Sequence, residues 1–285
     1  MRQGSQSVLC RPALARDTAQ ALGMVKGIWQ GEDYIPQVWN SWLEDERGLL
    51  AVAELAGQVV GLGHLADMGL GEGWLEGLRV APQFQGRHFG SHLHEYFVGR
   101  WQSSDLTVVR LATNVSRVEV HRMCERTSFR RVGEVVFHRA PALPGPHELE
   151  PFRGDPTEPS DTLRQRGTCR LTQGLMDLGW EFVQMTPLRL ERGEALRLWR
   201  WRGGEGWLVT NSNDPGSEEE LTLTAAHAED LTALFLDVRR LAAAQGATEV
   251  HWLAPKDAGI LGALGEAGYD SGGDDGGLFI YERWR

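Results

Sequence analysis

The sequence predicts an α/β protein of the α+β type, in which a mixed, mostly antiparallel sheet is flanked by helices and the arrangement occurs twice in tandem. Three observations predict this fold class. The chain has 285 residues, enough for about two domains. Its front half contains three successive strand-like runs that are typical of an antiparallel meander. Its back half repeats part of the same order of helix and strand patterns.

Two amphipathic helices are expected before the meander. Asp17 is expected to cap the first helix and Asp33 the second, because a short acidic side chain can accept a hydrogen bond from the first free N–H groups. In the second helix the apolar residues recur at i, i+3, i+4, i+7 and i+8. The apolar residues are Leu22, Val25, Ile28 and Trp29 in the first helix, and Ile35, Val38, Trp39, Trp42 and Leu43 in the second.

The strands and later helices of the front half follow in a regular order. Strands are predicted over 49–56, 58–66 and 73–80, with a turn at Ala56-Gly57 between the first two. The later patterns complete the order β-α-α-β-β-β-α-β-α-β. They are a helix through 93–101, a strand over 107–113, a helix over 117–127 and a strand over 131–138.

A segment rich in Pro and Gly separates the two halves. Because it shows no hydrophobic period, it is predicted to be a linker. We therefore expect a front domain over 1–142, a linker over 143–165 and a back domain over 166–285. The back domain is predicted to contain strands at 221–224, 249–254 and 278–281 and helices through 231–241 and 260–267.

Charge and cysteine content exclude several classes of partner and site. The formal net charge of −10 gives no overall attraction to nucleic acid or to anionic membranes. The cysteines Cys10, Cys124 and Cys169 form no C-x-x-C pair, so neither a disulfide framework nor a zinc site is indicated. No apolar run is long enough to span a membrane, and the first twenty residues lack a signal-peptide pattern. We expect a cytoplasmic protein.

The most informative segment runs from Leu78 to Ser91 as strand, loop and helix start. Glycines in such a loop let the backbone approach a ligand, and the helix start directs free N–H groups and the positive end of its dipole toward the loop. This arrangement is typical of a pyrophosphate site. An ordinary Gly-containing connection capped by Ser91 is the alternative that these residues leave open.

The same segment resembles the signature of the GNAT superfamily of acyl-CoA-dependent N-acetyltransferases, V-x-P followed by [QR]-x-x-G-x-[GA]. Val80, Pro82, Gln85 and Gly90 match it, and His88 stands where the family usually has its middle glycine. If position 88 requires a positive φ, His is less suited than Gly but tolerates it better than most residues. The order of elements in the whole front domain is also that of the family.

Two stretches narrow the resemblance to the histidine N-acetyltransferase-like branch: D-Y-I-P at 33–36 and E-G-L-R-V-A-P at 76–82. The resemblance implies that the front domain is catalytic and transfers an acetyl group from acetyl-CoA, the co-substrate, to a primary amine of a small molecule. A free amino acid such as histidine is the acceptor that the branch implies. A protein N-terminus or an aminoglycoside-type acceptor stays open, because the acidic back domain would attract polycations.

The resemblance also implies which residues contact acetyl-CoA. The family splays the strand before the loop from its parallel neighbour, which frees backbone N–H groups for the thioester and the pantetheine arm. An amide at the end of the next strand would bond the same arm. The implied cofactor-binding residues are Leu78, Arg79, Val80, Gln85, Gly86, Arg87, His88, Phe89, Gly90, Ser91 and Asn114.

Glu76 and Cys124 are the expected catalytic residues. Alternation with Trp74 and Leu78 predicts a half-buried Glu76, which suits a general base. Cys124 stands where many members of the family carry the Tyr that protonates the leaving thiolate. Inert packing is the alternative for Cys124, because Cys is often buried. His121 shares its helix face and is a weaker candidate for proton transfer.

The connection between the first two helices is where the family usually selects its acceptor. Trp29, Asp33 and Tyr34 are expected to hold a cationic amine, although capping of the helix explains Asp33 alone. His92 and His94 are two residues apart on a helix and so face different ways, which argues against a metal site.

The back domain resembles a degenerate second copy. Residues 225–230, before its helix, contain no glycine, and Leu264 occupies the position of Cys124, so no cofactor is expected there. It would cover the front domain or shape its acceptor site, and exposed Trp residues would allow a homodimer as well as a monomer. A catalytically inactive acyl-CoA-binding, sensor or interaction module is the alternative function of the whole chain.

Overall fold

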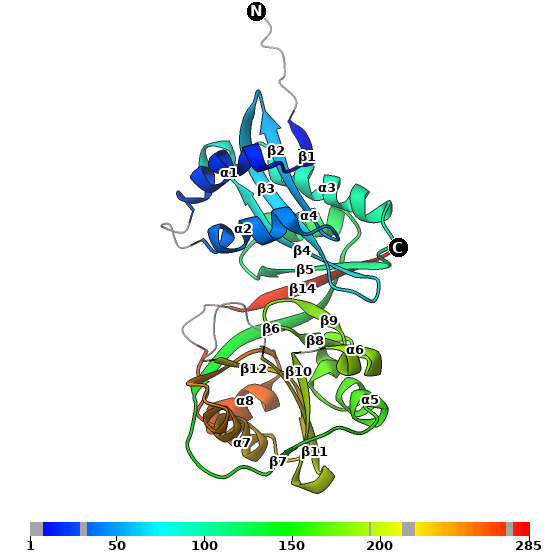
Figure 1. Cartoon of the computed structure of the whole chain (residues 1–285), viewed down its shortest axis with the longest axis vertical. Helices are drawn as coiled ribbons and strands as arrows, with labels where there is room; N and C mark the ends of the chain where they lie inside the picture. The colour runs from blue at the N-terminus through cyan, green and yellow to red at the C-terminus, as the bar shows by residue number, and fades with distance from the viewer. Residues whose placement is uncertain (1–7, 29–32, 194, 213–219, 272–275) are drawn as a thin grey trace, which may run out of the picture. The chain divides into compact units, whose positions relative to one another are not determined.

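The computed structural model divides the chain into two compact units that are interleaved along the sequence (Figure 1). The described residues are 8–28, 33–193, 195–212, 220–271 and 276–285. Unit 1 comprises Met1–Leu111, Glu119–Arg130 and Glu282–Arg285, and unit 2 comprises Ala112–Val118 and Arg131–Tyr281. Sequence reasoning expected a single boundary near residue 142, and that division into separable domains stays a prediction.

The sheet of unit 1 begins as an antiparallel meander and ends with a parallel strand. Its strands are β1 (Leu9–Pro12), β2 (Leu49–Leu55), β3 (Gln58–Asp67), β4 (Glu72–Val80) and β5 (Val108–Asn114). They lie in sequence order, and only β5 runs parallel to its neighbour, β4. Positive φ angles at Ala56 and Gly57 make the predicted turn between β2 and β3.

Helices cover both faces of this sheet. They are α1 (Thr18–Val25), α2 (Ile35–Glu44), α3 (Phe89–Gln102) and α4 (Val118–Arg126). Leu62 of β3 belongs to the buried cluster that α1 and α2 form with β2 and β3. A Cβ at the flanking Gly61 or Gly63 would instead meet Leu93 or Phe97 of α3. Because neighbouring residues of a strand face opposite ways, α3 lies on the other face.

Asp17 does not cap α1 as the sequence predicted. Its carboxylate accepts hydrogen bonds from the Arg11 guanidinium (2.6 and 2.8 Å) and from the N–H of Leu14 (2.8 Å). The pKa of Asp17 is lowered mainly by the Arg11 hydrogen bond. The prediction was wrong because Arg11, on the neighbouring strand β1, is a stronger partner for a carboxylate than a helix N–H.

The last residues of the chain belong to unit 1 and hold a buried cation there. Arg110 of β5 has no exposed surface, and its guanidinium donates to Glu282 (2.8 Å) and to Glu72 of β4. Arg285 donates its backbone N–H to the carbonyl of Thr107 (3.0 Å). Two buried carboxylates therefore balance Arg110, and one of them comes from the end of the chain.

Unit 2 repeats the topology of unit 1. Strands β7, β10, β11 and β12 are antiparallel neighbours, and β13 runs parallel to β12. Helices α5 and α6 lie between β7 and β10 in the chain, as α1 and α2 lie between β1 and β2. This correspondence confirms the predicted repeat of elements. The strands are β6 (Arg130–Pro141), β7 (Leu149–Pro151), β8 (Leu175–Asp177), β9 (Phe182–Gln184), β10 (Leu196–Trp201), β11 (Gly206–Asn211), β12 (Glu220–Ala228), β13 (Glu249–Pro255) and β14 (Leu278–Trp284), and the helices are α5 (Thr157–Gln165), α6 (Pro187–Arg192), α7 (Leu231–Ala244) and α8 (Ala258–Glu266).

The segment 143–165, predicted to be a linker, contains β7 and α5. Pro159, Ser160 and Leu163 form the buried face of α5. Because only Leu163 on this face is a large aliphatic residue, the segment shows no hydrophobic period in the sequence, and the helix was missed.

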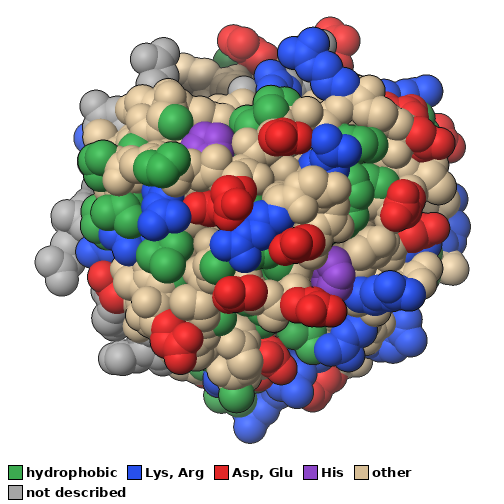
Figure 2. All heavy atoms as spheres, turned by 90° about the horizontal axis from the view of Figure 1, so that it is seen from below, with side chains coloured by type: hydrophobic (Ala, Val, Ile, Leu, Met, Phe, Trp, Pro, Cys, Tyr) green, Lys and Arg blue, Asp and Glu red, His purple; other side chains and the backbone are tan. Residues whose placement is uncertain are grey.

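Figure 2 shows acidic and basic side chains interspersed on one face of the molecule. Among the helices of the described residues, none combines the length and the apolar character that a membrane span requires.

Candidate active site

A bulge in β4 shapes the centre of unit 1. Gly77 has a φ of +64°, and the β3–β4 register shifts between Leu62 and His64, so β4 carries one extra residue there. A Cβ at Gly77 would lie 2.7 Å from the indole of Trp42, which shows how closely α2 packs on the bulge. The predicted alternation therefore ends at Glu76, and Leu78 does not continue it.

Glu76 is half-buried, as predicted, and is bonded to a histidine that the sequence analysis missed. Its Oε1 lies 2.8 Å from Nδ1 of His64, the residue opposite it in the β3–β4 register. The Glu76 side chain is 16% exposed and that of His64 only 2%. Within the described part of the chain, the second carboxylate oxygen of Glu76 has no hydrogen-bond partner. One oxygen is therefore fixed, and the other can meet a substrate proton.

An aromatic side chain fixes the imidazole from the other direction. The Trp42 ring stacks on His64, with centroids 4.5 Å apart and planes 13° from parallel, and Tyr34 meets Trp42 edge-on at 6.0 Å. The signal for His64 in the sequence was a single ionisable residue within the otherwise apolar strand 59–66.

The expected acceptor residues are only partly brought together. Asp33 is buried, accepts a hydrogen bond from the N–H of Ile35 (3.1 Å) and pairs with Arg79 Nε at 2.8 Å. Arg79 also lies over the Tyr34 ring, 5.4 Å from its centroid. Asp33 therefore bonds the first N–H of α2, although Tyr34 and not Asp33 is the N-cap residue, and the charge of Asp33 is already balanced by Arg79. Trp29 lies outside the described residues.

The loop before α3 contains two residues with positive φ, Gly86 and His88. Pro82–Phe84 form one short 3-10 turn, Gly86 has a φ of +74°, and His88 has a φ of +65° and a ψ of +10°. Position 88 thus adopts the left-handed region, and histidine occupies it in place of glycine. Gln85 lies next to this turn and donates its side-chain N–H to the carbonyl of Val80 (3.2 Å).

The N-terminus of α3 is open and positively charged. Its first backbone bond runs from the N–H of His92 to the carbonyl of His88 (3.0 Å), so the N–H groups of Phe89, Gly90 and Ser91 precede the intrahelical pattern. Arg126 of α4 donates to the Ser91 hydroxyl (3.1 Å). Arg126 is a further cationic residue that the sequence analysis missed, and it suits an anion at this helix end.

The loop side chains and the strand before them complete this part of the site. The exposed Arg87 lies over the rings of Phe84 (5.6 Å) and Phe89 (5.2 Å). Pairing of β4 with β5 covers only Glu72–Trp74, so Leu78, Arg79 and Val80 lie beyond the last residue that pairs with β5. This early end of the ladder is the splay that the resemblance implied.

Cys124 is buried, whereas a catalytic acid has to be accessible to the leaving thiolate. Its side chain has no exposed surface, and burial raises its thiol pKa to about 12. These observations favour the packing alternative, and a catalytic role for Cys124 stays a prediction. His121 lies beside it on α4 and is partly exposed. Asn114 belongs to unit 2, and its side-chain oxygen accepts hydrogen bonds from the N–H (2.9 Å) and hydroxyl (2.7 Å) of Ser116.

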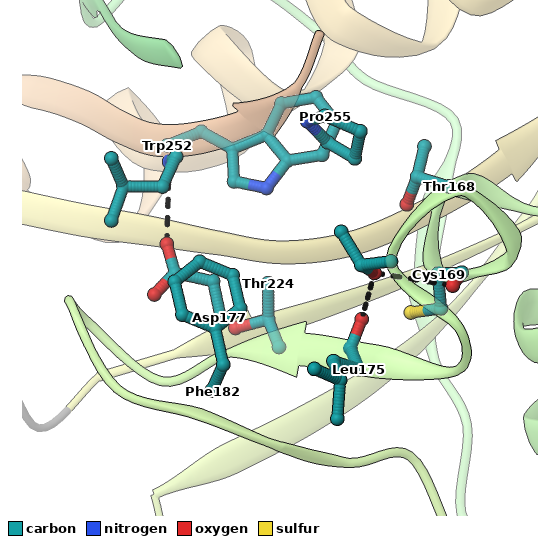
Figure 3. Close-up of a pocket in the computed structure, with 10 residues that line it drawn as sticks. Thr168, Cys169, Leu175, Asp177, Phe182, Thr224, Trp252 and Pro255 are labelled. Carbon is teal, nitrogen blue, oxygen red and sulfur yellow. Dashed lines mark hydrogen bonds between the residues drawn. The ribbon is translucent and has the colours of Figure 1, made fainter. Parts of the chain in front are cut away.

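In unit 2, the unit's own side chains fill the place that is equivalent to the splayed strands of unit 1. Pairing of β12 with β13 covers only Glu220–Thr222 and Glu249–His251. Beyond it, the N–H of Ala226 donates to the Thr168 hydroxyl (3.0 Å) and the N–H of Leu253 to the Asp177 carboxylate (3.2 Å). Figure 3 shows these side chains around a cavity of about 10 Å³, room for roughly one water molecule. Side chains of unit 2 therefore accept hydrogen bonds from two strand N–H groups beyond this pairing.

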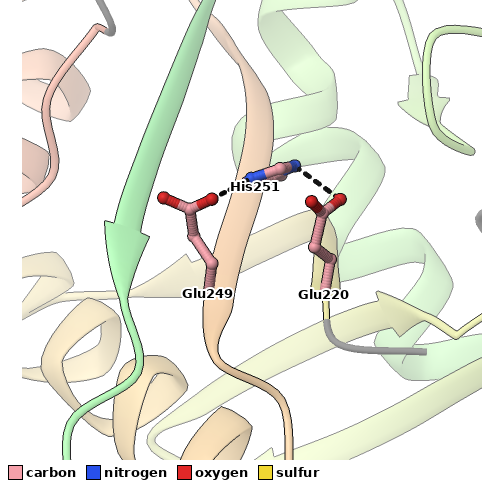
Figure 4. Close-up of side chains that lie close together, drawn as sticks. All are labelled: Glu220, Glu249 and His251. Carbon is pink, nitrogen blue, oxygen red and sulfur yellow. Dashed lines mark hydrogen bonds and ion pairs between the residues drawn. The ribbon is translucent and has the colours of Figure 1, made fainter. Parts of the chain in front are cut away.

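A second His–carboxylate cluster lies in unit 2. Glu220, Glu249 and His251 are close enough together to hold a metal ion (Figure 4). Each carboxylate bonds a different ring nitrogen of His251: Glu220 lies 3.0 Å from Nδ1 and Glu249 2.7 Å from Nε2. An ion could bind this imidazole only by displacing one of these two contacts, so the arrangement is that of an ion-pair triad.

Comparison with known families matches the front of the chain. Residues 15–129 match the Acetyltransferase (GNAT) family. This range contains Glu76, His64, the loop before α3 and α2, which packs on the β4 bulge.

Two named relatives are similar to part of the chain. A histidine N-acetyltransferase of Oreochromis niloticus is 37% identical over 76 residues, which are 26% of this chain and 23% of the relative. Probable N-acetyltransferase 16 of Homo sapiens is 34% identical over 85 residues, 30% of this chain and 23% of the relative. The matched part thus spans about a quarter of the length of these relatives.

Solved structures share the fold of the whole chain. A GCN5-related N-acetyltransferase from Sphaerobacter thermophilus has a TM-score of 0.62 at 13% identity and covers 97% of this chain and 95% of its own. A tandem GNAT protein from the clavulanic acid biosynthesis pathway has a TM-score of 0.55 at 12% identity, covering 98% of both chains. At these identities the likeness concerns the fold, which agrees with the tandem fold predicted.

Proposed function

We propose that this chain, whose residues 15–129 form a GNAT acetyltransferase domain, transfers an acetyl group from acetyl-CoA to the primary amine of a small molecule. A free amino acid such as histidine is the proposed acceptor, because the named relatives include histidine N-acetyltransferases. The observation that carries the proposal is the position of Glu76: it is half-buried, bonded through one oxygen, and lies on the strand that leads into the loop before α3.

The start of α3 fits the diphosphate of acetyl-CoA. Three N–H groups lie at the positive end of the helix, and His88, with its left-handed backbone, lets the chain turn into the helix there. Arg126 and Arg87 add positive charge beside this helix end. Acetyl-CoA supplies an activated thioester, and the splayed part of β4 supplies the backbone that we expect to align it.

The acceptor amine must lose a proton before it can attack. Glu76 is the proposed base, acting directly or through a water molecule, because its second carboxylate oxygen is available and its first is held by His64. Asp33 is paired with Arg79, so recognition of the cationic acceptor is expected from Glu76 and the aromatic face of Tyr34 rather than from Asp33.

Titration calorimetry with acetyl-CoA tests the cofactor site. Gly90→Glu places a carboxylate at the start of α3 and is expected to abolish binding by charge repulsion and steric filling. Gly99→Glu is the matched control, because Gly99 is an exposed glycine on the same helix whose added Cβ would meet nothing within 4 Å. Acetyl-CoA binding that survives Gly90→Glu would remove this loop as the site.

An acceptor screen separates the enzyme from its alternative. CoA release would be followed with L-histidine, other free amino acids, an aminoglycoside and a peptide with a free N-terminus. Release with free amino acids supports the proposal. Binding of acetyl-CoA without transfer to any of these amines would favour an inactive acyl-CoA-binding or sensor protein.

A further inference from the structure

His64 lies between two carboxylates that come from different parts of unit 1. Glu76 meets its Nδ1 at 2.8 Å, and Oδ2 of Asp45, which follows α2, lies 3.9 Å from its Nε2. Among the described residues, Nε2 is buried without a hydrogen-bond partner. The side chains of Glu76, His64 and Asp45 are 16%, 2% and 29% exposed. The three groups thus lead from the proposed base, through a buried ring, to a carboxylate in contact with solvent.

Gly48 keeps the outer end of this arrangement open. A Cβ at position 48 would collide with the Asp45 carboxylate and would lie 2.8 Å from Nε2 of His64. The approach of Asp45 to the imidazole therefore depends on the missing side chain. A small shift of the partly exposed Asp45 side chain, or one bridging water, would close the remaining gap to Nε2.

We infer that His64 and Asp45 form a proton path that carries the acceptor's proton from Glu76 to solvent, an inference that rests on the proposed function. The acceptor enters as an ammonium ion. As its N–C bond to the acetyl group forms and the C–S bond breaks, two protons leave the nitrogen: one returns to the thiolate, and one must leave the site. Glu76 takes the departing proton. With the ring in its Nε2–H tautomer, the protonated Glu76 donates to Nδ1 while Nε2 releases its proton toward Asp45, which leaves Nδ1–H bonded to the Glu76 carboxylate. Exchange of the ring back to the Nε2–H tautomer completes the cycle.

Among the described residues, two carboxylates face the ring of His64: Glu76 from β4 and Asp45, which follows α2. Leu50, its register partner on β2, and the stacked Trp42 are further neighbours. Trp42 holds the ring plane so that the two nitrogens point toward the two carboxylates.

The first test compares His64→Gln with His251→Gln. Gln can hydrogen bond to Glu76 but cannot pass a proton from one ring nitrogen to another. With acetyl-CoA and L-histidine at pH 7, we expect His64→Gln to lower kcat about tenfold or more while the Kd for acetyl-CoA changes less than about twofold. His251→Gln, the histidine with two carboxylate partners in unit 2, is expected to leave kcat unchanged.

The second test uses pH and the outer end of the path. Asp45→Asn and Gly48→Ala keep His64 and Glu76 but remove or displace the terminal carboxylate. Both are expected to lower kcat most below pH 7 and to approach the wild-type rate toward pH 9, where more of the acceptor is already deprotonated. A purely structural role for His64 would lower kcat by a similar factor at every pH.

The outcomes separate the path from the proposed function. If His64→Gln and Asp45→Asn leave kcat and its pH profile as in an active wild-type enzyme, the path is overturned and the acetyltransferase proposal stands. A wild-type protein that binds acetyl-CoA but transfers to no amine overturns the proposed function.

Discussion

The two units of this protein end their parallel strand pairing in the same way but use the freed backbone differently. In unit 1, β4 pairs with β5 over Glu72–Trp74 only, and in unit 2, β12 pairs with β13 over Glu220–Thr222 only. Unit 2 covers its freed N–H groups with Thr168 and Asp177. Topology alone therefore does not make a binding site, because side chains of the chain itself can bond the N–H groups that the same splay leaves free.

The N-termini of α3 and α7, the helices that follow the two splayed strands, differ in whether a side chain of the protein caps them. In unit 2, Asp230 accepts a hydrogen bond from the N–H of Ala233 (2.9 Å) and so brings a negative charge to the start of α7. In unit 1, His88 precedes α3 and makes no such side-chain cap, and Arg126 lies nearby. A charged cap occupies the place that an anionic ligand would take, so of these two helix starts that of α3 is the one suited to an anion, in keeping with the acetyl-CoA site proposed for unit 1.

The histidines flanked by carboxylates extend the comparison. His251 uses both ring nitrogens, at 3.0 and 2.7 Å from its partners, whereas His64 uses only Nδ1 at short range. His251 is also more exposed, at 19% against 2%. His251, whose two ring nitrogens both have carboxylate partners, serves as part of an ion-pair cluster. His64, whose Nε2 lacks a hydrogen-bond partner among the described residues, has a ring nitrogen available for proton transfer.

The largest expected effect concerns stability, and it tests how far unit 1 depends on the end of the chain. Glu282→Gln removes one of the two carboxylates that balance the fully buried Arg110. We expect a loss of about 1.5–3 kcal/mol in the free energy of unfolding, because a buried hydrogen bond between charged groups is weakened while Glu72 still pairs with Arg110. Urea denaturation measures it. Glu134→Gln, in the exposed pair with Lys256, is the control and should cost no more than about 1 kcal/mol.

The next effect concerns activity and compares one carboxylate in each unit. Glu76→Gln is expected to lower kcat about a hundredfold or more, because the neutral amide cannot accept the acceptor's proton. Glu249→Gln makes the same change beside His251 and is expected to leave kcat unaltered. Steady-state rates between pH 6 and 9 decide the matter: equal kcat values for Glu76→Gln and wild type would remove Glu76 as the base.

A smaller effect is expected on the free energy of unfolding in acid, and it arises from a buried histidine of unit 1. Burial, with help from Arg283 and Arg126, lowers the pKa of His94 from 6.5 to about 4. The unfolded chain therefore binds a proton at His94 between these values, and the folded protein does not. Stability is expected to fall by about 1.4 kcal/mol per pH unit as pH drops from 6.5 to 4. His94→Gln should flatten this slope, and a slope that His94→Gln leaves unchanged would assign it to other groups.

The sequence allowed most of unit 1 to be predicted because its elements carry strong local signals. The strands 49–56, 58–66 and 73–80 and the turn at Ala56-Gly57 agree with β2, β3 and β4 to within about two residues. The loop before α3 was found from its glycines and proline. By contrast, α5 was missed because its buried face has one large apolar residue, and β7 because it has three residues.

The candidate site was predicted residue by residue where one element sufficed and missed where two elements meet. Glu76 was found from its place on one strand. His64 and Arg126 were missed because the first needs the β3–β4 register and the second needs the contact of α4 with α3. The Asp33–Arg79 pair was missed for the same reason: it joins residues 46 positions apart.

The smallest expected effect on activity comes from Cys124, and it sharpens the comparison of the two copies. Cys124 in unit 1 and Leu264 in unit 2, equated from sequence, are both fully buried on the helix after the parallel strand. If this position serves packing in both units, Cys124→Ala should leave kcat within about twofold of wild type and cost stability by removing buried volume. Steady-state rates and urea denaturation of this variant are the measurements. A large loss of kcat with stability unchanged would instead restore Cys124 as the acid, since a thiol that only fills space cannot alter the rate without altering the fold.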